Sequence, residues 1–156
     1  MGYVRETITK DIFKLENKLR KADRDELYKA TGNDPRSVLR KSYILSTECY
    51  SIICNCKKKE KMVGVFGVVE HQGNGIIWMV ASDLLVTKKH SKKFIRQTKT
   101  WVNKLNDKYP LLFNVVDKSN EVHIRWLKWS GFTFIKEKPW GAFGFPFIEF
   151  ARIKNV

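Results

Sequence analysis

The chain has 156 residues, of which 43% are apolar and 13% aromatic; this is enough for one folded domain and too apolar for a disordered chain. Its 30 lysines and arginines against 16 acidic residues give a net charge of +14, which favours anionic partners: nucleic acid, a membrane surface or a polyphosphate cofactor. No apolar run approaches the ~20 residues that span a bilayer, and residues 1–10 lack the apolar stretch of a secretory signal peptide.

One strand and three helices are predicted in the first third of the chain: Tyr3–Ile8, a helix from Thr9, Ala22–Ala30, and a helix from Pro35. Apolar residues recur at helical spacing in the first of these helices: Ile12, Leu15 and Leu19. Thr9 and Asp34 are residue types favoured at helix N-caps, and Gly32 is a typical helix end. This part of the chain is therefore predicted to be mainly helical.

The middle of the chain is predicted to form three antiparallel strands: Glu48–Cys56, Met62–Val69 and Ile76–Ala81. His71–Gly75 contains asparagine and glycine and is a strong turn signal. The strand Glu48–Cys56 carries all three cysteines, Cys49, Cys54 and Cys56. No second Cys or His pair stands at zinc-ligand spacing, so we predict no metal site. We expect the cysteines to be small buried side chains rather than a disulfide.

Helices and strands alternate in the last third: helix Lys89–Lys108, strand Leu111–Val116, helix Asn120–Trp129, and strands Phe132–Ile135 and Phe145–Ile153. The long helix is amphipathic, because Phe94, Val102 and Leu105 share one face of it. Residues 1–156 are predicted to form a single α/β domain. Its sheet is expected to be mixed and mostly antiparallel, with helices on both faces.

The order of these elements resembles the GCN5-related N-acetyltransferase (GNAT) superfamily. In that superfamily a strand is followed by Asn, a short helix and Gly-Phe, and Asn120, Gly131 and Phe132 stand at the matching positions. Asn is expected to cap the helix, Gly to take a left-handed conformation at its end, and Phe to enter the core. The resemblance implies the acyl-CoA N-acyltransferase fold, in which the fourth and fifth strands splay apart.

A closer resemblance, over about Trp78 to Ile153, is to the acetyltransferase-like internal virion proteins of podovirus-type phages. The residues that carry it are Tyr109–Asp117, then Asn120, and then His123–Leu127. It implies a role in a phage particle or during infection, with phage virion or host proteins as partners. The expected location is the host cytoplasm, the virion or both. The resemblance does not by itself imply acetyl transfer.

An acetyltransferase of this kind would bind acetyl-CoA along a strand edge and at a helix N-terminus. The resemblance places the pantetheine arm at Met79, Val80 and Ala81. The expected phosphate contacts are Lys88, Lys89, Ser91, Lys92 and Lys93, and Asn120 is a further cofactor-binding candidate. The superfamily has an Arg/Gln-x-x-Gly-x-Gly/Ala run in this loop, whereas this sequence has no glycine there. Thr87–Lys108 nevertheless holds eight basic residues against Asp107 alone.

Three residues are candidates for acid–base catalysis: Glu70 and Asp83 at strand ends, and His123 on the short helix. The superfamily usually has Tyr seven residues after the Asn of its motif, as the acid for the leaving thiolate. This sequence has Leu127 there, and an alkyl side chain cannot give a proton. The alternative interpretation is two ordinary strand-end carboxylates and a half-buried histidine.

Three functions therefore stay open. The first is a phage acetyltransferase-fold protein with degenerate chemistry that acts through protein contacts. The second is an active acetyl-CoA-dependent N-acetyltransferase that modifies an amine of a host protein or small molecule. The third is a nucleic-acid-binding module that uses the Lys88–Lys108 face. The aromatic segment Lys138–Phe147, predicted as a loop, would border the cleft, with Trp140 and Phe143 in an acceptor site, in a protein contact or packed in the core.

Overall fold

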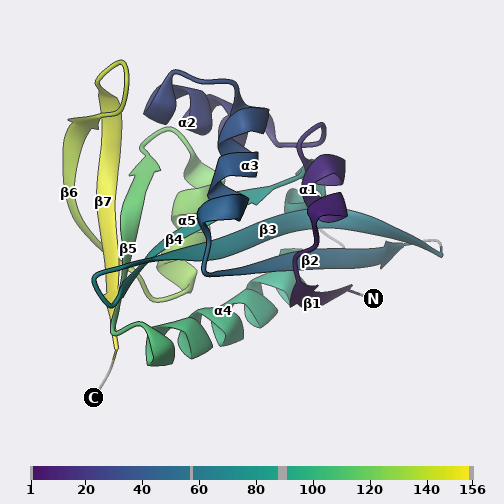
Figure 1. The fold of residues 1–156 in the computed structure, drawn as a ribbon. Helices are drawn as coiled ribbons and strands as arrows, with labels where there is room; N and C mark the ends of the chain where they lie inside the picture. Colours follow the sequence, from purple (N-terminus) through teal and green to yellow (C-terminus); the bar gives the residue numbers. More distant parts are fainter. Residues whose placement is uncertain (1, 57, 88–90, 155–156) are drawn as a thin grey trace.

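The computed structural model describes residues 2–56, 58–87 and 91–154 and shows one seven-stranded sheet between two layers of helices (Figure 1). The strands are β1 (Gly2–Glu6), β2 (Glu48–Cys56), β3 (Lys59–His71), β4 (Asn74–Ala81), β5 (Leu111–Asp117), β6 (Thr133–Trp140) and β7 (Phe145–Ile153). The helices are α1 (Thr9–Leu15), α2 (Lys21–Thr31), α3 (Pro35–Leu45), the 3-10 helix η1 (Asp83–Val86), α4 (Ser91–Lys108) and α5 (Glu121–Trp129).

The sheet has the strand order β1-β2-β3-β4-β5-β7-β6, and among the described strands the only parallel pair is β4 with β5. These two strands pair only at Gly75 with Leu112 and at Ile76 with Phe113, and they separate beyond that point. On either side, β1–β4 and β5–β7–β6 are antiparallel. Two antiparallel halves are thus joined by a short parallel contact, which confirms the predicted fold class and its splayed fourth and fifth strands.

The two faces of the sheet have separate apolar cores. On one face α1 and α3 bury side chains against β2–β4, among them Ile12, Leu15, Leu39, Val65 and Val80. On the other face α4 and α5 bury a larger set, among them Phe94, Val102, Leu105, Trp126 and Leu127. The predicted apolar stripe of the long helix therefore faces the sheet. Its polar side is left at the surface.

Several local predictions are confirmed by the backbone. Gly32 (φ 74°) and Gly131 (φ 88°) follow α2 and α5 in the left-handed conformation that stops a helix. The side chain of Asp34 caps α3 by accepting a hydrogen bond from the backbone of Arg36. The predicted bounds of β2 and β7 are those observed.

Two predicted N-caps are wrong. Thr9 is the first residue of α1 and not its cap; the carboxylate of Asp11 instead accepts the hydrogen bond from the backbone N–H of Ile8. Asn120 does occupy the N-cap position of α5, but its side chain makes no capping hydrogen bond. Its Nδ2 donates to Asp23 of α2, and its buried Oδ1, the atom that would accept the capping bond, has no partner among the described residues.

The segment Lys138–Phe147 was predicted as a loop and is largely strand. After a bulge, β6 continues to pair with β7 as far as Trp140 with Phe145, which leaves only residues 141–144 as the turn. β6 lies at the edge of the sheet, where Pro139 is tolerated because one side of the strand needs no partner. The expectation for Cys54 is also wrong, since it is disulfide-bonded. Cys49 is a free thiol.

Membrane-spanning helices and metal-binding groups were searched for in the described part of the chain. None of the described helices is both long and apolar enough to span a membrane. Among the described side chains, no group of three His, Cys, Asp or Glu residues is placed to hold a metal ion.

Candidate functional site

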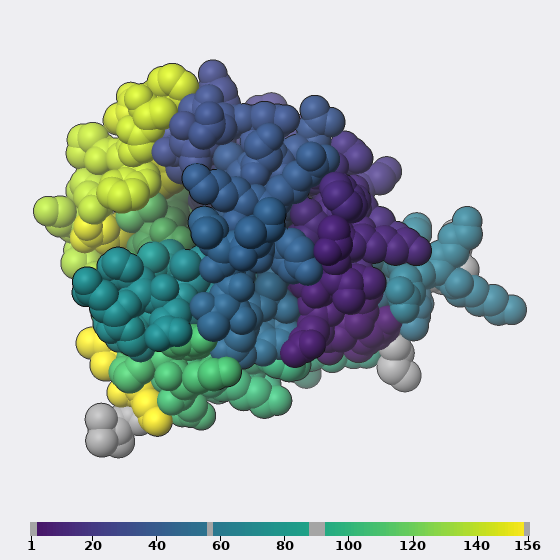
Figure 2. All heavy atoms as spheres, viewed as in Figure 1, coloured from purple at the N-terminus to yellow at the C-terminus, as the bar shows by residue number. Residues whose placement is uncertain are grey.

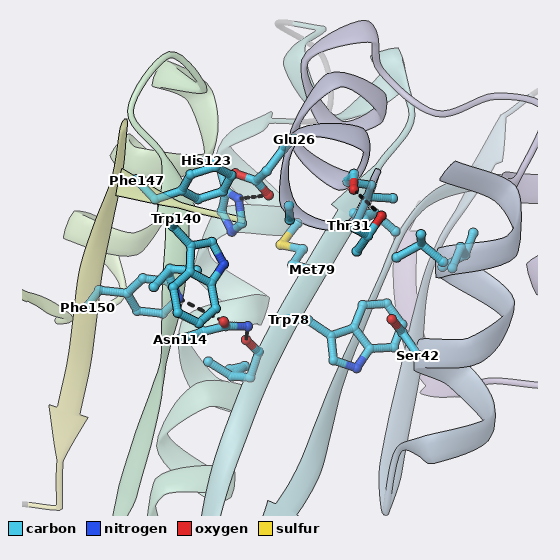
Figure 3. Close-up of a pocket in the computed structure, with 17 residues that line it drawn as sticks. Glu26, Thr31, Ser42, Trp78, Met79, Asn114, His123, Trp140, Phe147 and Phe150 are labelled. Carbon is cyan, nitrogen blue, oxygen red and sulfur yellow. Dashed lines mark hydrogen bonds and ion pairs between the residues drawn. The ribbon is translucent and has the colours of Figure 1, made fainter. Parts of the chain in front are cut away.

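A cavity of about 190 Å³ lies where β4 and β5 have separated (Figure 3). Its walls come from α2, α3, β4, β5 and the β6–β7 hairpin, and they include Trp78, Met79, Trp140, Phe147 and Phe150. The amide of Asn114 donates to the backbone oxygen of Ile77 (2.8 Å), so a β5 side chain replaces the missing strand pairing at the start of the splay. The cavity is mainly apolar, with aliphatic and aromatic side chains, and Glu26 and His123 lie at one side.

α2 places a buried carboxylate, Asp23, in the opening between the splayed strands. Asp23 Oδ2 accepts a hydrogen bond from the backbone N–H of Ala81 on β4 (2.9 Å). Its Oδ1 accepts from Asn120 Nδ2 (2.9 Å) and from Arg20 Nη1 (3.1 Å). Three donors from three segments therefore converge on one carboxylate, which is the arrangement that a buried charge requires.

The end of β4 is closed on its carbonyl side as well. The backbone N–H of Arg20 donates to the carbonyl of Ala81 (2.9 Å), and Leu19 forms an isolated antiparallel bridge with Ser82. Both backbone groups of Ala81 that face the opening are thus satisfied by the segment that leads into α2. An extended ligand can pair with β4 at this position only if Arg20 and Asp23 are displaced.

A second α2 carboxylate, Glu26, reaches the opposite strand. Glu26 Oε1 accepts a hydrogen bond from the backbone N–H of Asp117 on β5 (2.8 Å). Its Oε2 lies 3.5 Å from Nδ1 of His123, an ion-pair distance with the imidazole of α5. α2 therefore bridges the splay: Asp23 holds the β4 side and Glu26 holds the β5 side.

The buried charges around α2 balance when His123 is protonated. Three carboxylates face three cations: Asp23, Glu26 and Asp117 against Arg20, Lys29 and His123. Burial alone would lower the pKa of His123, but the charges of Glu26 and Asp23 outweigh it and raise this pKa. Burial raises the pKa of Asp23, against the opposing charges of His123 and Arg20.

The three candidate catalytic residues are not brought together. Glu70 is exposed at the hairpin end of β3, opposite Gly75, where β4 and β5 are still paired. Asp83 is exposed at the start of η1, beyond the far end of β4 and about 25 Å from that hairpin at the rise of a strand. Only His123 lines the cavity, and it faces Glu26.

The cofactor-binding candidates are placed as follows. Met79 and Val80 lie on β4 along the cavity, and Ala81 is closed by Asp23 and Arg20. Lys88 and Lys89 lie outside the described residues, and so do the side chains of Ser91 and Lys92, while Lys93 is exposed on α4. Asn120 is buried and bonded to Asp23. Leu127 is fully buried in the core under α4 and α5.

Sequence reasoning missed Asp23 and Glu26, although α2 carries a signal for them. The helix has one large aliphatic residue, Leu27, so an apolar stripe cannot be its buried face. Arg20, Asp23 and Glu26 recur three residues apart and share one side of the helix. A helix with that pattern, inside a sheet domain, is expected to bury ion pairs.

Four exposed aromatic rings of α2 and the β6–β7 hairpin form what we call the aromatic tip, and one of them, Trp140, also lines the cavity: Tyr28, Trp140, Phe143 and Phe145. The ring centroids of Tyr28 and Phe143 are 5.3 Å apart, and those of Phe143 and Phe145 are 6.4 Å apart. Figure 2 shows the β6–β7 turn (yellow-green) lying against the blue-violet α2. An ideal Cβ on Gly141 would lie 2.5 Å from the backbone oxygen of Lys29, so the turn touches the backbone of α2.

Solved acetyltransferases have this fold. A GNAT-family acetyltransferase from Streptococcus pneumoniae superposes with a TM-score of 0.63 at 13% identity, over 99% of this chain and 100% of the other. The ribosomal-protein-S5-alanine acetyltransferase of Vibrio fischeri gives 0.66 at 15%, over 99% and 93%. The spermidine N-acetyltransferase of Vibrio cholerae, in complex with CoA and spermine, gives 0.68 at 9%, over 98% and 95%. The chain therefore has the GNAT fold, a class of structure that the splayed β4 and β5 define.

The sequence places the chain more narrowly. A protein-family profile described as "Bacteriophage T7, probable scaffold protein Gp13" matches residues 55–139, from the end of β2 into β6. That match covers more than half of the chain, and the chain belongs to this family. No curated protein sequence matches it significantly.

Proposed function

We propose that this chain acts through protein contacts in or around a phage particle, on an acetyltransferase fold whose acetyl-CoA chemistry is degenerate. The observation that carries this proposal is the closed edge of β4, where Ala81 is hydrogen-bonded to Asp23 and Arg20. A pantetheine arm along that edge would displace both partners. It would also leave the buried carboxylate of Asp23 without its strand partner, at a cost of several kcal/mol.

Two observations support the phage setting. The family to which the chain belongs is described as a probable phage scaffold protein. The run Tyr109–Asp117, with Asn120 and His123–Leu127 after it, resembles the acetyltransferase-like internal virion proteins of podovirus-type phages. Proteins that build or fill a particle act by binding other proteins, so a closed cofactor edge is no obstacle to such a role.

The aromatic tip is the surface that best fits a protein partner. Its rings are solvent-exposed, adjacent to one another and continuous with the cavity through Trp140. Aromatic rings next to a pocket are the kind of surface that anchors a protein interface. We therefore place the contact with a virion or host protein at this tip.

The test is made in the phage that encodes the chain. Trp140→Ser together with Phe143→Ser should remove the protein from purified particles, as measured by quantitative mass spectrometry. The matched control is Ile44→Ser with Leu45→Ser, two exposed apolar residues on α3 (77% and 56%). Equal melting temperatures of both variants would show that folding is intact. Retention of the tip variant in particles, or equal loss of the control, would contradict the proposal.

A second candidate function is N-acetyl transfer to an amine of a host protein or small molecule. It is favoured by one observation: Glu26 and His123 form a carboxylate–imidazole pair at the cavity, and general base catalysis needs a group of this kind. Calorimetric titration of acetyl-CoA separates the two functions. Micromolar binding that weakens when Lys88, Lys89, Lys92 and Lys93 become Ala would favour the enzyme. Absence of heat would favour the protein-contact function.

A further inference from the structure

The excess of positive charge is concentrated on one layer of the molecule. From Leu84 to Asn106 the sequence contains seven lysines and arginines and no acidic residue. In the described part of this stretch, Lys93, Arg96 and Lys104 project from α4 into solvent. α4 lies on the face of the sheet opposite α1 and α3 (Figure 1).

The other helical layer is different, because acidic residues are interspersed among its cations: residues 9–45 contain ten lysines and arginines and six aspartates and glutamates. In or beside α1–α3, five basic side chains form ion pairs with carboxylates: Arg20, Lys21, Lys29, Arg36 and Arg40. The net charge of +14 is therefore not spread evenly over the surface. Unpaired lysines also lie in the α1–α3 layer, but the longest stretch of the sequence that carries cations and no acidic residue is the one from Leu84 to Asn106.

The two helices present their cations together. Trp126 of α5 donates a hydrogen bond to Thr98 of α4 (2.9 Å), and Lys99 of α4 lies 4.9 Å from the ring centroid of Trp129. The exposed residues Arg125 and Lys128 lie on the same helix as these two tryptophans, and Lys128 is 5.8 Å from the ring centroid of Phe134 on β6. We call this surface the basic face: Lys93, Arg96, Lys99, Lys104, Arg125 and Lys128. None of the six forms an ion pair with a described carboxylate, whereas Lys108, at the end of α4, is paired with Glu48.

The chemistry of the basic face favours a phosphate polymer over a lipid surface. A helix that lies in a membrane inserts an apolar stripe. The apolar stripe of α4 is instead buried, with Phe94 and Val102 at 1% and 0% exposure. Trp129, at 48%, is the one large apolar side chain of α5 that is exposed, and none of α4 is. Cations without an insertable apolar face are suited to a chain of phosphates.

We propose that the basic face binds nucleic acid through its phosphates, without selection of base sequence. The inference is independent of the β4 edge at Ala81 and of the aromatic tip, which lie elsewhere on the fold; Lys93 alone is shared with the expected phosphate contacts of acetyl-CoA. Six phosphate contacts predict a log–log salt dependence of the binding constant of roughly −5 on duplex DNA, at about −0.9 per contact.

The experiment measures binding of the full chain to a fluorescein-labelled DNA duplex by anisotropy, over a series of salt concentrations. The test variant carries Lys93→Gln, Arg96→Gln, Arg125→Gln and Lys128→Gln. The control carries Lys10→Gln, Lys14→Gln, Lys18→Gln and Lys41→Gln, four exposed lysines of the α1–α3 layer that form no ion pair with a described carboxylate. Both variants lower the net charge by the same four units.

The basic-face variant should bind at least tenfold more weakly, with a salt slope smaller in magnitude by roughly 3 to 4. The control should change affinity by less than about threefold, because only diffuse attraction is reduced. Equal losses in the two variants would assign the binding to net charge and overturn the proposal. So would failure of the wild-type chain to bind the duplex at low salt, or binding to phosphatidylserine vesicles in preference to it.

Discussion

Among single residues, Asp23 makes the contacts on which the site depends most. Its carboxylate accepts hydrogen bonds from Ala81, Asn120 and Arg20, and all four residues are buried. Asp23→Ala leaves an amide, a side-chain amide and a guanidinium without their partner. We expect the free energy of unfolding to fall by about 3 to 5 kcal/mol, as measured by urea denaturation.

The matched control for Asp23 is Asp25 on the same helix. Asp25 is 46% exposed and pairs only with Lys21, so Asp25→Ala should cost less than about 1 kcal/mol. A loss at Asp23 no larger than the loss at Asp25 would show that the buried contacts do not carry the stability assigned to them.

His123 makes the stability of the fold depend on pH. Its pKa is raised in the folded state, so the folded chain binds a proton more tightly than the unfolded chain. The stability from this group is present below the unfolded pKa of about 6.5 and is lost as the pH rises through the higher folded pKa. Urea denaturation at a series of pH values above 6.5 should show this loss in the wild type and not in His123→Gln.

His71 supplies the control for the pH experiment, since it is exposed at the end of β3. His71→Gln should retain the pH dependence of the wild type. If His123→Gln kept it as well, the ion pair with Glu26 would not be its source.

At this scale the sequence predicted less than at any other. Asn120 was recognised from its place before a short helix, but its partner, Asp23, is 97 residues away and no local pattern links the two. His123 was a candidate on the basis of its helix alone. The spacing of Arg20, Asp23 and Glu26 could have indicated a buried charged side of α2, but it could not identify His123 as the partner of Glu26, because that contact depends on the fold.

Among the helices and strands, α2 makes the contacts that hold the site together. Its charged side holds the two splayed strands through Asp23 and Glu26, and its C-terminal end touches the β6–β7 turn at Gly141 and Phe143. Gly141→Ala would force a Cβ to 2.5 Å from the backbone oxygen of Lys29 at a φ of +79°. Beyond the ~1–2 kcal/mol for the left-handed conformation, we expect a further loss of about 1 to 3 kcal/mol in urea denaturation.

The same turn contains its own control. Gly144 also has a positive φ (+70°), but a Cβ there would meet nothing within 4 Å. Gly144→Ala therefore reports the backbone cost alone. If the two substitutions cost the same, the turn is not held against α2.

Elements were the scale at which the sequence predicted most. Apolar periodicity predicted α4, and the turn signals between apolar runs predicted the three consecutive antiparallel strands β2–β4. The glycines after α2 and α5 predicted where these helices end. The length of β6 was underestimated, because Lys136, Glu137, Lys138 and Pro139 do not form an apolar strand pattern. An edge strand that pairs on one side only does not need one.

On the scale of the whole molecule, the order of elements and the Asn-to-Gly-Phe spacing were enough to predict the fold, because both are properties of the chain read in sequence. They could not show that side chains of the same chain occupy the opening between β4 and β5. The opening between β4 and β5 is a general feature of the GNAT fold, whereas its closure by α2 depends on three residues of one helix and the segment before it: Arg20, Asp23 and Glu26.

The central claim is that the edge of β4 already has its partners, and hydrogen exchange at the backbone amide of Ala81 tests it most directly. The account predicts slow exchange in the protein alone and no change on addition of acetyl-CoA. Fast exchange at Ala81 that becomes slow when acetyl-CoA is added would contradict it, since the edge would then be open and the cofactor would fill it.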